Sequence, residues 1–185
     1  MHKQIKDLIF INGFFVFAIN MFAPLYALFI QKLSTDVIHV GLIWAVYIIC
    51  SGVFVFFISR YENHLKYADY FLVAGFLMRV VGWTGYLFAS SLWHIYAIQL
   101  FLALGEAFGT PSYNSLFSWY LDKTKFASEW GMNQAINSFI MGAAAFIGAA
   151  IVQRFGFNAL FAVMIVLSFI STFLAIRFRR QLNTR

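Results

Sequence analysis

Six apolar segments long enough to cross a membrane constrain this chain more than any other feature of its sequence. The hydrocarbon core of a bilayer is about 30 Å thick, so a helix needs about 20 apolar residues to cross it. The apolar runs are too long for barrel strands, and backbone groups in lipid must therefore be satisfied inside helices. We predict an all-α, polytopic membrane protein with six transmembrane helices at approximately 8–30, 40–58, 67–88, 92–120, 126–152 and 157–176.

Composition leaves almost no polar surface to face water. Hydrophobic residues make up 62% of the 185 residues, charged residues make up 11%, and there are 24 phenylalanines. Such a balance is typical of a membrane domain, and we expect residues 1–185 to form one. The first apolar segment is too long for a signal-peptide core and has no small-residue cleavage site near its end, so we expect it to stay in the mature protein.

The basic residues fall on alternate connections. Ten lie at the N-terminus, at every second connection or at the C-terminus, whereas only Lys32 and Arg154 lie on the opposite side. By the positive-inside rule this predicts a multi-pass protein of the cell (plasma or inner) membrane with both termini in the cytoplasm. The net charge of +6 is therefore interpreted as a topology signal within the lipid bilayer, not as nucleic-acid binding. The ten are Lys3, Lys6, Arg60, Lys66, Lys123, Lys125, Arg177, Arg179, Arg180 and Arg185.

The sequence offers little to an intramembrane enzyme or a metal ion. Cys50 is the only cysteine, and it lies inside the second segment. His2, His39 and His64 lie in termini or loops, and His94 lies at the start of a segment. Hydrolases and zinc sites need a nucleophile with a histidine, or paired ligands, at membrane depth. We expect no enzyme activity, no cofactor and no metal.

Two charged residues lie well inside the predicted crossings, where a charge is unfavourable. At 1.5 Å per residue, Arg79 lies about 18 Å and Glu106 about 21 Å from the same side, so we expect them to lie level. Two interpretations remain open. In one, they form a salt bridge that neutralises both charges. In the other, Glu106 is a protonatable group or a cation ligand, and it binds or releases a proton as its contact with Arg79 changes.

Further polar residues on the first, fourth and fifth predicted helices suggest a water-filled cavity, although hydrogen bonds between helices would also account for each one. With Glu106, we consider Asn20, Gln99 and Asn114 the residues that line a substrate cavity. Tyr26, Tyr47, Trp83 and Tyr113 are aromatic candidates to face this cavity. The alternative is that they lie at the membrane interfaces, where tryptophan and tyrosine are usually found. Pro24 and Pro111 each remove a backbone hydrogen bond and predict a kink or a local break.

Small residues form one long face of the fifth predicted helix. Gly142, Ala145, Gly148 and Ala149 belong to this face, and small residues let another helix approach closely. Gly105 and Gly109 repeat the four-residue spacing in the fourth helix. Tight packing within one bundle and packing across a subunit interface that must slide are both consistent with these patterns.

Several segments resemble the Major Facilitator Superfamily. The resemblance rests on residues 104–111 (LGEAFGTP), on 122–131 and the small-residue helix after it, on 154–157 (RFGF), on 40–43 (VGLI) and on Pro24. Two features depart from the family pattern. The loop at residues 59–66 (SRYENHLK) keeps only scattered charges of the motif G-x-x-x-D-R-x-G-R-R, and Gln99 replaces the arginine of the fourth helix, so proton coupling through that arginine is not supported.

The resemblance implies a fold of two similar six-helix halves, with substrate bound between them. This chain corresponds to one N-terminal-type half. The resemblance therefore implies a transporter of a small solute that works by alternating access, as a parallel homodimer with a central cavity lined by helices 1 and 4. Helix 2 would meet helix 5 of the partner through the face of Gly142, Ala145, Gly148 and Ala149. The alternative is a non-transporting membrane partner or scaffold subunit that pairs with another integral membrane protein.

Overall fold

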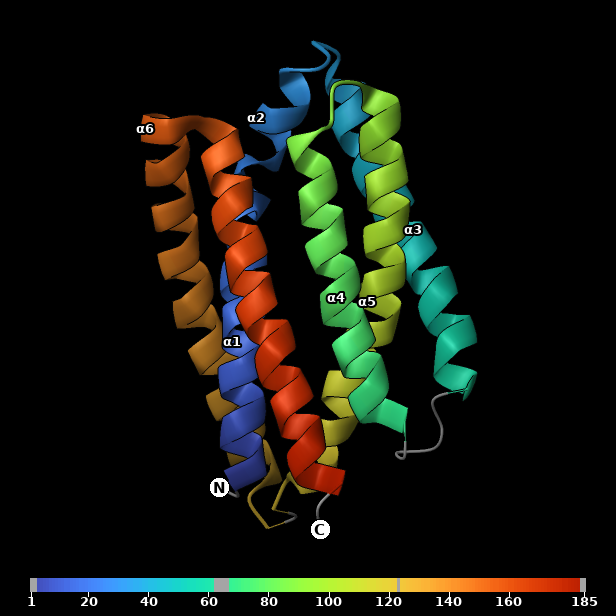
Figure 1. The fold of residues 1–185 in the computed structure, drawn as a ribbon, viewed down its shortest axis with the longest axis vertical. Helices are drawn as coiled ribbons and strands as arrows, with labels where there is room; N and C mark the ends of the chain where they lie inside the picture. The colour runs from blue at the N-terminus through green and yellow to red at the C-terminus, as the bar shows by residue number, and fades with distance from the viewer. Residues whose placement is uncertain (1–2, 62–66, 123, 184–185) are drawn as a thin grey trace.

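The computed structural model describes residues 3–61, 67–122 and 124–183, and every regular element in these ranges is a helix (Figure 1). Both ends of the chain lie at the same end of the bundle (Figure 1). Lys66, Lys123, Arg185, His2 and His64 lie outside the described residues. The elements are α1 (Lys3–Phe22), η1 (Ala23–Leu25), α2 (Tyr26–Gln31), α3 (Val37–Tyr61), α4 (Ala68–Leu87), α5 (Leu92–Tyr120) and α6 (Phe126–Asn183).

Five helical stretches in the described part of the chain are long and apolar enough to cross a membrane. They are Lys3–Gln31, Val37–Arg60, Ala68–Leu87, Leu92–Tyr120 and Phe126–Gln181. The all-α prediction is confirmed, but six separate helices are not shown, because the last two predicted crossings both fall within α6.

The 58 residues of α6 would form a rod about 87 Å long if they were straight, several times what one crossing needs. Gly156 interrupts the helical backbone with φ 80° and ψ 179°, a conformation that is essentially restricted to glycine. At this point the chain reverses, and residues 126–155 and 157–183 run side by side in opposite directions (Figure 1). The glycine in the sequence RFGF thus sets the corner between the two parts.

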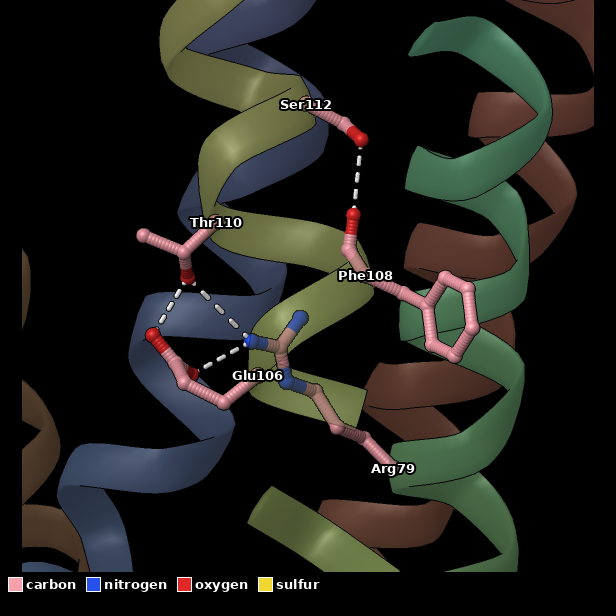
Figure 2. Close-up of polar contacts among 5 residues, drawn as sticks. All are labelled: Arg79, Glu106, Phe108, Thr110 and Ser112. Atoms are coloured by element: carbon pink, nitrogen blue, oxygen red, sulfur yellow. Dashed lines mark hydrogen bonds and ion pairs between the residues drawn. The ribbon is translucent and has the colours of Figure 1, made fainter. Parts of the chain in front are cut away.

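The two prolines have different effects. Pro24 lies in the 3₁₀ turn η1 that separates α1 from α2, so the predicted local break is confirmed there. Pro111 lies inside α5, which continues as one α-helix from Leu92 to Tyr120. The Ser112 hydroxyl donates to the Phe108 carbonyl at 2.7 Å, next to the bond that proline cannot make (Figure 2). Hydroxyl groups of this kind help to satisfy the backbone around a proline in a membrane helix.

Phe22 holds one end of the bundle together. Its ring packs edge-on against rings of α2, α4 and α6, with centroids 5.2–6.4 Å apart. Aromatic pairs at these separations are favourable beyond the area they bury. The rings are those of Tyr26, Phe29, Trp83, Tyr86, Phe157 and Phe161. This cluster therefore ties the elements beyond the Pro24 break to the rest of the fold.

Glycines bring α4 and α5 into direct backbone contact. A Cβ atom added at Gly75 would lie 2.5 Å from the Gly109 Cα and 2.9 Å from the Gly105 carbonyl oxygen. Small residues permit this close approach of membrane helices. Gly105 and Gly109 therefore pack within the chain. Of the two interpretations of their spacing, packing within one bundle is the one that the structure confirms.

α3 stands apart from the other helices. Only 11% of the residues in its most apolar stretch are buried, compared with 39–44% in the other candidate membrane spans. It packs mainly on α5, whereas α1 packs on α6 and α4 packs on both α5 and α6. Its outer face includes Gly41 and Gly52, where an added Cβ would meet nothing within 4 Å. In this chain alone, α3 thus presents a broad apolar face with no protein against it.

We predict that Gly75→Ala lowers the free energy of unfolding by about 1–3 kcal/mol, because its methyl group would overlap the backbone of α5. Helix propensity alone predicts the opposite sign, since alanine favours a helix by about 1 kcal/mol over glycine. Thermal unfolding in detergent measures the difference. Gly131→Ala, where an added Cβ would meet nothing within 4 Å, is the matched control and should be neutral or stabilising. An unchanged melting temperature for Gly75→Ala would contradict the close α4–α5 contact.

Candidate functional site

A partly buried ion pair joins α4 to α5 (Figure 2). Arg79 Nη2 donates to Glu106 Oε2 at 2.6 Å, and its contact with Thr110 Oγ1 is 3.4 Å long. The Thr110 hydroxyl donates to the other carboxylate oxygen, Oε1. Charge-assisted hydrogen bonds of this kind are the stronger ones in proteins. Both carboxylate oxygens of Glu106 therefore have partners.

The surroundings of Arg79 explain how a guanidinium is accommodated at this depth. Its side chain is 4% exposed, and its guanidinium carbon lies 4.0 Å from the ring centroid of Phe15 on α1, a cation–π contact. On its other side, Nη1 lies against Gly109, where a methyl group would overlap it. The glycine that brings the two helices together thus also makes room for the charge.

Glu106 is the more accessible member of the pair. Its side chain is 26% exposed, and Tyr47 of α3 lies close enough to interact with the carboxylate electrostatically. The carboxylate therefore joins α4 to α5, and α3 borders it. A pair in which only the acid is partly accessible can exchange a proton or a ligand at the acid while the arginine stays enclosed.

An aromatic cavity of about 210 Å³ adjoins the ion pair. Residues from α1 through α5 form its walls, and Arg79 is the charged residue among them. The lining is mostly apolar with a few convergent polar groups, as in many small-molecule sites. The lining residues are Ile19, Asn20, Phe22, Ala23, Tyr26, Trp44, Tyr47, Arg79, Trp83, Tyr86, Gln99 and Leu102.

The structure brings some of the predicted cavity residues together and leaves others apart. Asn20 and Gln99 both line the aromatic cavity. The Asn20 amide donates to the Val16 carbonyl of its own helix at 2.8 Å. Glu106 is not part of the lining and meets the cavity through Arg79. Asn114 is exposed and is not part of the lining, and it lies about two helical turns beyond Glu106 on α5.

The aromatic candidates divide in the same way. Tyr26, Tyr47 and Trp83 line the aromatic cavity. Tyr113 does not, because its hydroxyl is buried and donates to Asn133 Oδ1 of α6 at 2.9 Å. This bond joins α5 to α6 and gives Tyr113 a packing role.

Among the lining residues that the sequence analysis missed, two had been assigned to the membrane interface. Trp44 and Tyr86 lie in the cavity wall. A Trp-x-x-Tyr spacing occurs three times, at Trp44 and Tyr47, at Trp83 and Tyr86, and at Trp93 and Tyr96, and the first two pairs line the cavity. Residues three apart share one helix face, so each pair presents both rings in the same direction.

The small-residue face of α6 is divided between two uses. Gly142 and Ala149 are exposed, and Ala145 is half-buried. Gly148 is buried, and a methyl group there would overlap the backbone of Met21 on α1. Gly148 therefore packs within the chain, whereas the other three remain accessible to a second molecule.

No three His, Cys, Asp or Glu side chains within the described ranges are grouped so that they could hold a metal ion.

A family model described as Major Facilitator Superfamily matches residues 8–184, which is nearly the whole chain. No curated protein and no solved structure matches the chain.

We predict that Arg79→Met lowers the free energy of unfolding by about 3–5 kcal/mol, because it leaves Glu106 partly buried without its countercharge. The double variant Arg79→Met/Glu106→Leu should recover most of this loss, since both charges are then removed together. Thermal unfolding in detergent of the two single variants and the double variant completes the cycle. A double variant as unstable as the sum of the two singles would mean that the pair contributes no coupling.

Proposed function

The chain belongs to the Major Facilitator Superfamily, and from that membership we propose that it transports a small solute by alternating access, as a parallel homodimer of half-transporters. Membership suggests a transporter and not an enzyme. Full transporters of the family contain two six-helix halves that are related by an axis along the membrane normal. The observation that carries the proposal is the exposed face of α3, which is apolar and has no neighbour in the single chain.

The proposed topology has six crossings with both termini in the cytoplasm. The two antiparallel parts of α6, on either side of Gly156, supply the fifth and sixth crossings. Six crossings return the chain to its starting side, in agreement with the two ends lying at one end of the bundle (Figure 1). The basic residues Arg177, Arg179 and Arg180 lie at that end and favour the cytoplasm.

In the proposed dimer, α3 of one subunit packs against the first part of α6 of its partner. The α3 face offers Gly41 and Gly52, and the α6 face offers Gly142 and Ala149, all without a side chain that would keep the helices apart. Ala145 lies between the last two. Small residues on both faces permit a close contact that slides without interlocking. Gly148 supports the α6 face by packing it onto α1.

In each subunit the solute would bind at the aromatic cavity and the ion pair. Asn20 and Gln99 supply amide groups at the cavity, and Glu106 supplies the partly exposed carboxylate beside it. Asn114, exposed on α5, would face the space between the subunits. The two subunits would rock as rigid bundles around this space, so that it opens to either side of the membrane in turn.

A non-transporting scaffold subunit is the second candidate, because the same exposed α3 face would serve an interface with a different membrane protein. In that case the face would contact a partner without self-association. The oligomeric state therefore separates the two functions.

We predict that the purified protein in nanodiscs has about twice the chain mass of 21.2 kDa. In a Cys50→Ser background, a tagged Ala45→Cys copy should crosslink to a differently tagged Gly142→Cys copy. Val166→Cys, on an exposed position of the second part of α6, replaces Gly142→Cys as the control and should not crosslink to Ala45→Cys. A monomeric mass, or equal crosslinking by the control, would overturn the homodimer.

A second prediction concerns the coupling of Glu106 to the rocking motion. Spin labels at Leu28, an exposed position of α2, should give two distances between subunits, whose ratio changes as the pH falls. Protonation of Glu106 removes the charge that holds Arg79 and should release the contact between them. Glu106→Gln should abolish the pH dependence, whereas Asp36→Asn in the loop before α3 should retain it. Retention of the pH dependence in Glu106→Gln would remove Glu106 from the mechanism.

A further inference from the structure

Two aromatic pairs from different helices form much of the wall of the aromatic cavity. Trp44 and Tyr47 on α3 have ring centroids 5.6 Å apart, and Trp83 and Tyr86 on α4 stack at 5.7 Å. The Tyr26 ring lies 5.6 Å from Trp44 and continues this wall onto α2. Aromatic walls attract flat rings, which they contact face-on or edge-on at similar distances. The shape of the lining thus favours a planar ligand.

The cavity is large enough for one substituted ring. Its volume of about 210 Å³ exceeds the roughly 150 Å³ at which an apolar protein cavity accepts benzene. A single aromatic ring with one polar substituent fits this space. A larger ligand would need part of its structure to extend past Trp44, which is 48% exposed and lies at the edge of the cavity.

Two hydrogen-bond donors in this wall have no partner. The Tyr26 hydroxyl and the Trp83 indole N–H are buried without a hydrogen bond. The two residues are only 7% and 3% exposed, so water does not replace the missing partner. The Tyr26 hydroxyl lies toward Gln99, another lining residue, without completing a hydrogen bond to it. Buried polar groups in proteins are normally paired, and an unpaired donor beside a cavity points to a ligand that supplies the acceptor. An indole N–H can only donate, so the ligand must carry an acceptor.

The charges beside the cavity disfavour an ionic ligand. Arg79 is the charged lining residue, and it repels a cation. Its positive charge is already matched by Glu106 at 2.6 Å, so an anion would have to compete with a carboxylate that is fixed in place. A charged ligand would also lose its hydration on entering a mostly apolar site. A neutral ligand avoids all three penalties.

We propose that the aromatic cavity of each subunit binds an uncharged, planar aromatic compound with a hydrogen-bond acceptor, whose ring lies among Tyr26, Trp44, Tyr47, Trp83 and Tyr86. The Tyr26 hydroxyl and the Trp83 N–H donate to the acceptor, and Gln99 selects its position. This rests on the proposed function, because it names the class of solute that the transporter would carry. Binding itself requires only the cavity of one chain.

Three compounds of nearly the same shape test the proposal. Benzamide is neutral, benzoate is an anion and benzamidine is a cation at neutral pH. Equilibrium dialysis of radiolabelled benzamide against the protein in nanodiscs measures binding, and the two ions are added as competitors. We expect saturable benzamide binding and at least about tenfold weaker competition by either ion. Tighter binding of benzoate or of benzamidine overturns the neutral class, as does the absence of saturable binding.

Two variants locate the ligand. Tyr26→Phe keeps the ring and removes the hydroxyl, and Trp83→Phe keeps a smaller aromatic ring and removes the indole N–H, so each should weaken benzamide binding about three- to tenfold. Trp93→Phe is the matched control, since Trp93 is 80% exposed and not part of the lining, and it should bind as the unaltered chain does. Equal effects of Trp83→Phe and Trp93→Phe would overturn the assignment to this cavity. Circular dichroism and melting temperature show that each variant is folded.

The two proposals fail separately. A monomeric protein that binds benzamide as described contradicts the dimeric transporter and supports the cavity assignment. A dimer with the predicted crosslinks that binds none of the three compounds contradicts the cavity assignment and leaves the transporter proposal in place.

Discussion

A guanidinium placed well inside a membrane helix must find a countercharge, and much of this bundle is arranged around that requirement. Arg79 reaches Glu106 because α4 and α5 touch through backbone at Gly75 and Gly109. Gly109 has a second role, since it leaves room for the guanidinium, which Phe15 of α1 contacts from another side. The ion pair, the glycine contact and the position of α1 are therefore interdependent, and a change in one disturbs the others.

The pair also determines the character of the cavity beside it. An unpaired arginine in an apolar pocket would select anions, and an unpaired carboxylate would select cations. Because the two charges neutralise each other across α4 and α5, the aromatic side chains and their unpaired donors would decide which ligand the proposed site accepts. The Trp-x-x-Tyr pairs of α3 and α4 build the aromatic wall because packing turns their faces inward, whereas the same spacing at Trp93 and Tyr96 on α5 lies outside the lining.

Helix type, most crossing bounds and the level position of Arg79 and Glu106 could be predicted from the sequence, because hydrocarbon thickness and helical rise leave few alternatives. Contacts between helices could not. Depth alone does not tell whether Gly148 faces α1 or a partner, or whether Trp44 and Tyr86 face lipid or a cavity. The direction in which each side chain faces depends on the rotation of its helix about the helix axis, and packing determines that rotation. Asn114 shows the same limit in the other direction. It was expected to line the cavity, but the single chain leaves it exposed.

α3 connects the outside of the subunit to its polar centre. Its outer face is exposed and apolar, while Trp44 and Tyr47 line the aromatic cavity. It packs mainly on α5, the helix that carries Glu106. A partner pressing on the outer face would therefore move the cavity wall that Trp44 and Tyr47 form. Since α3 has few other contacts to resist such a shift, it is the element through which an interface between subunits would act on the bound solute and on the ion pair.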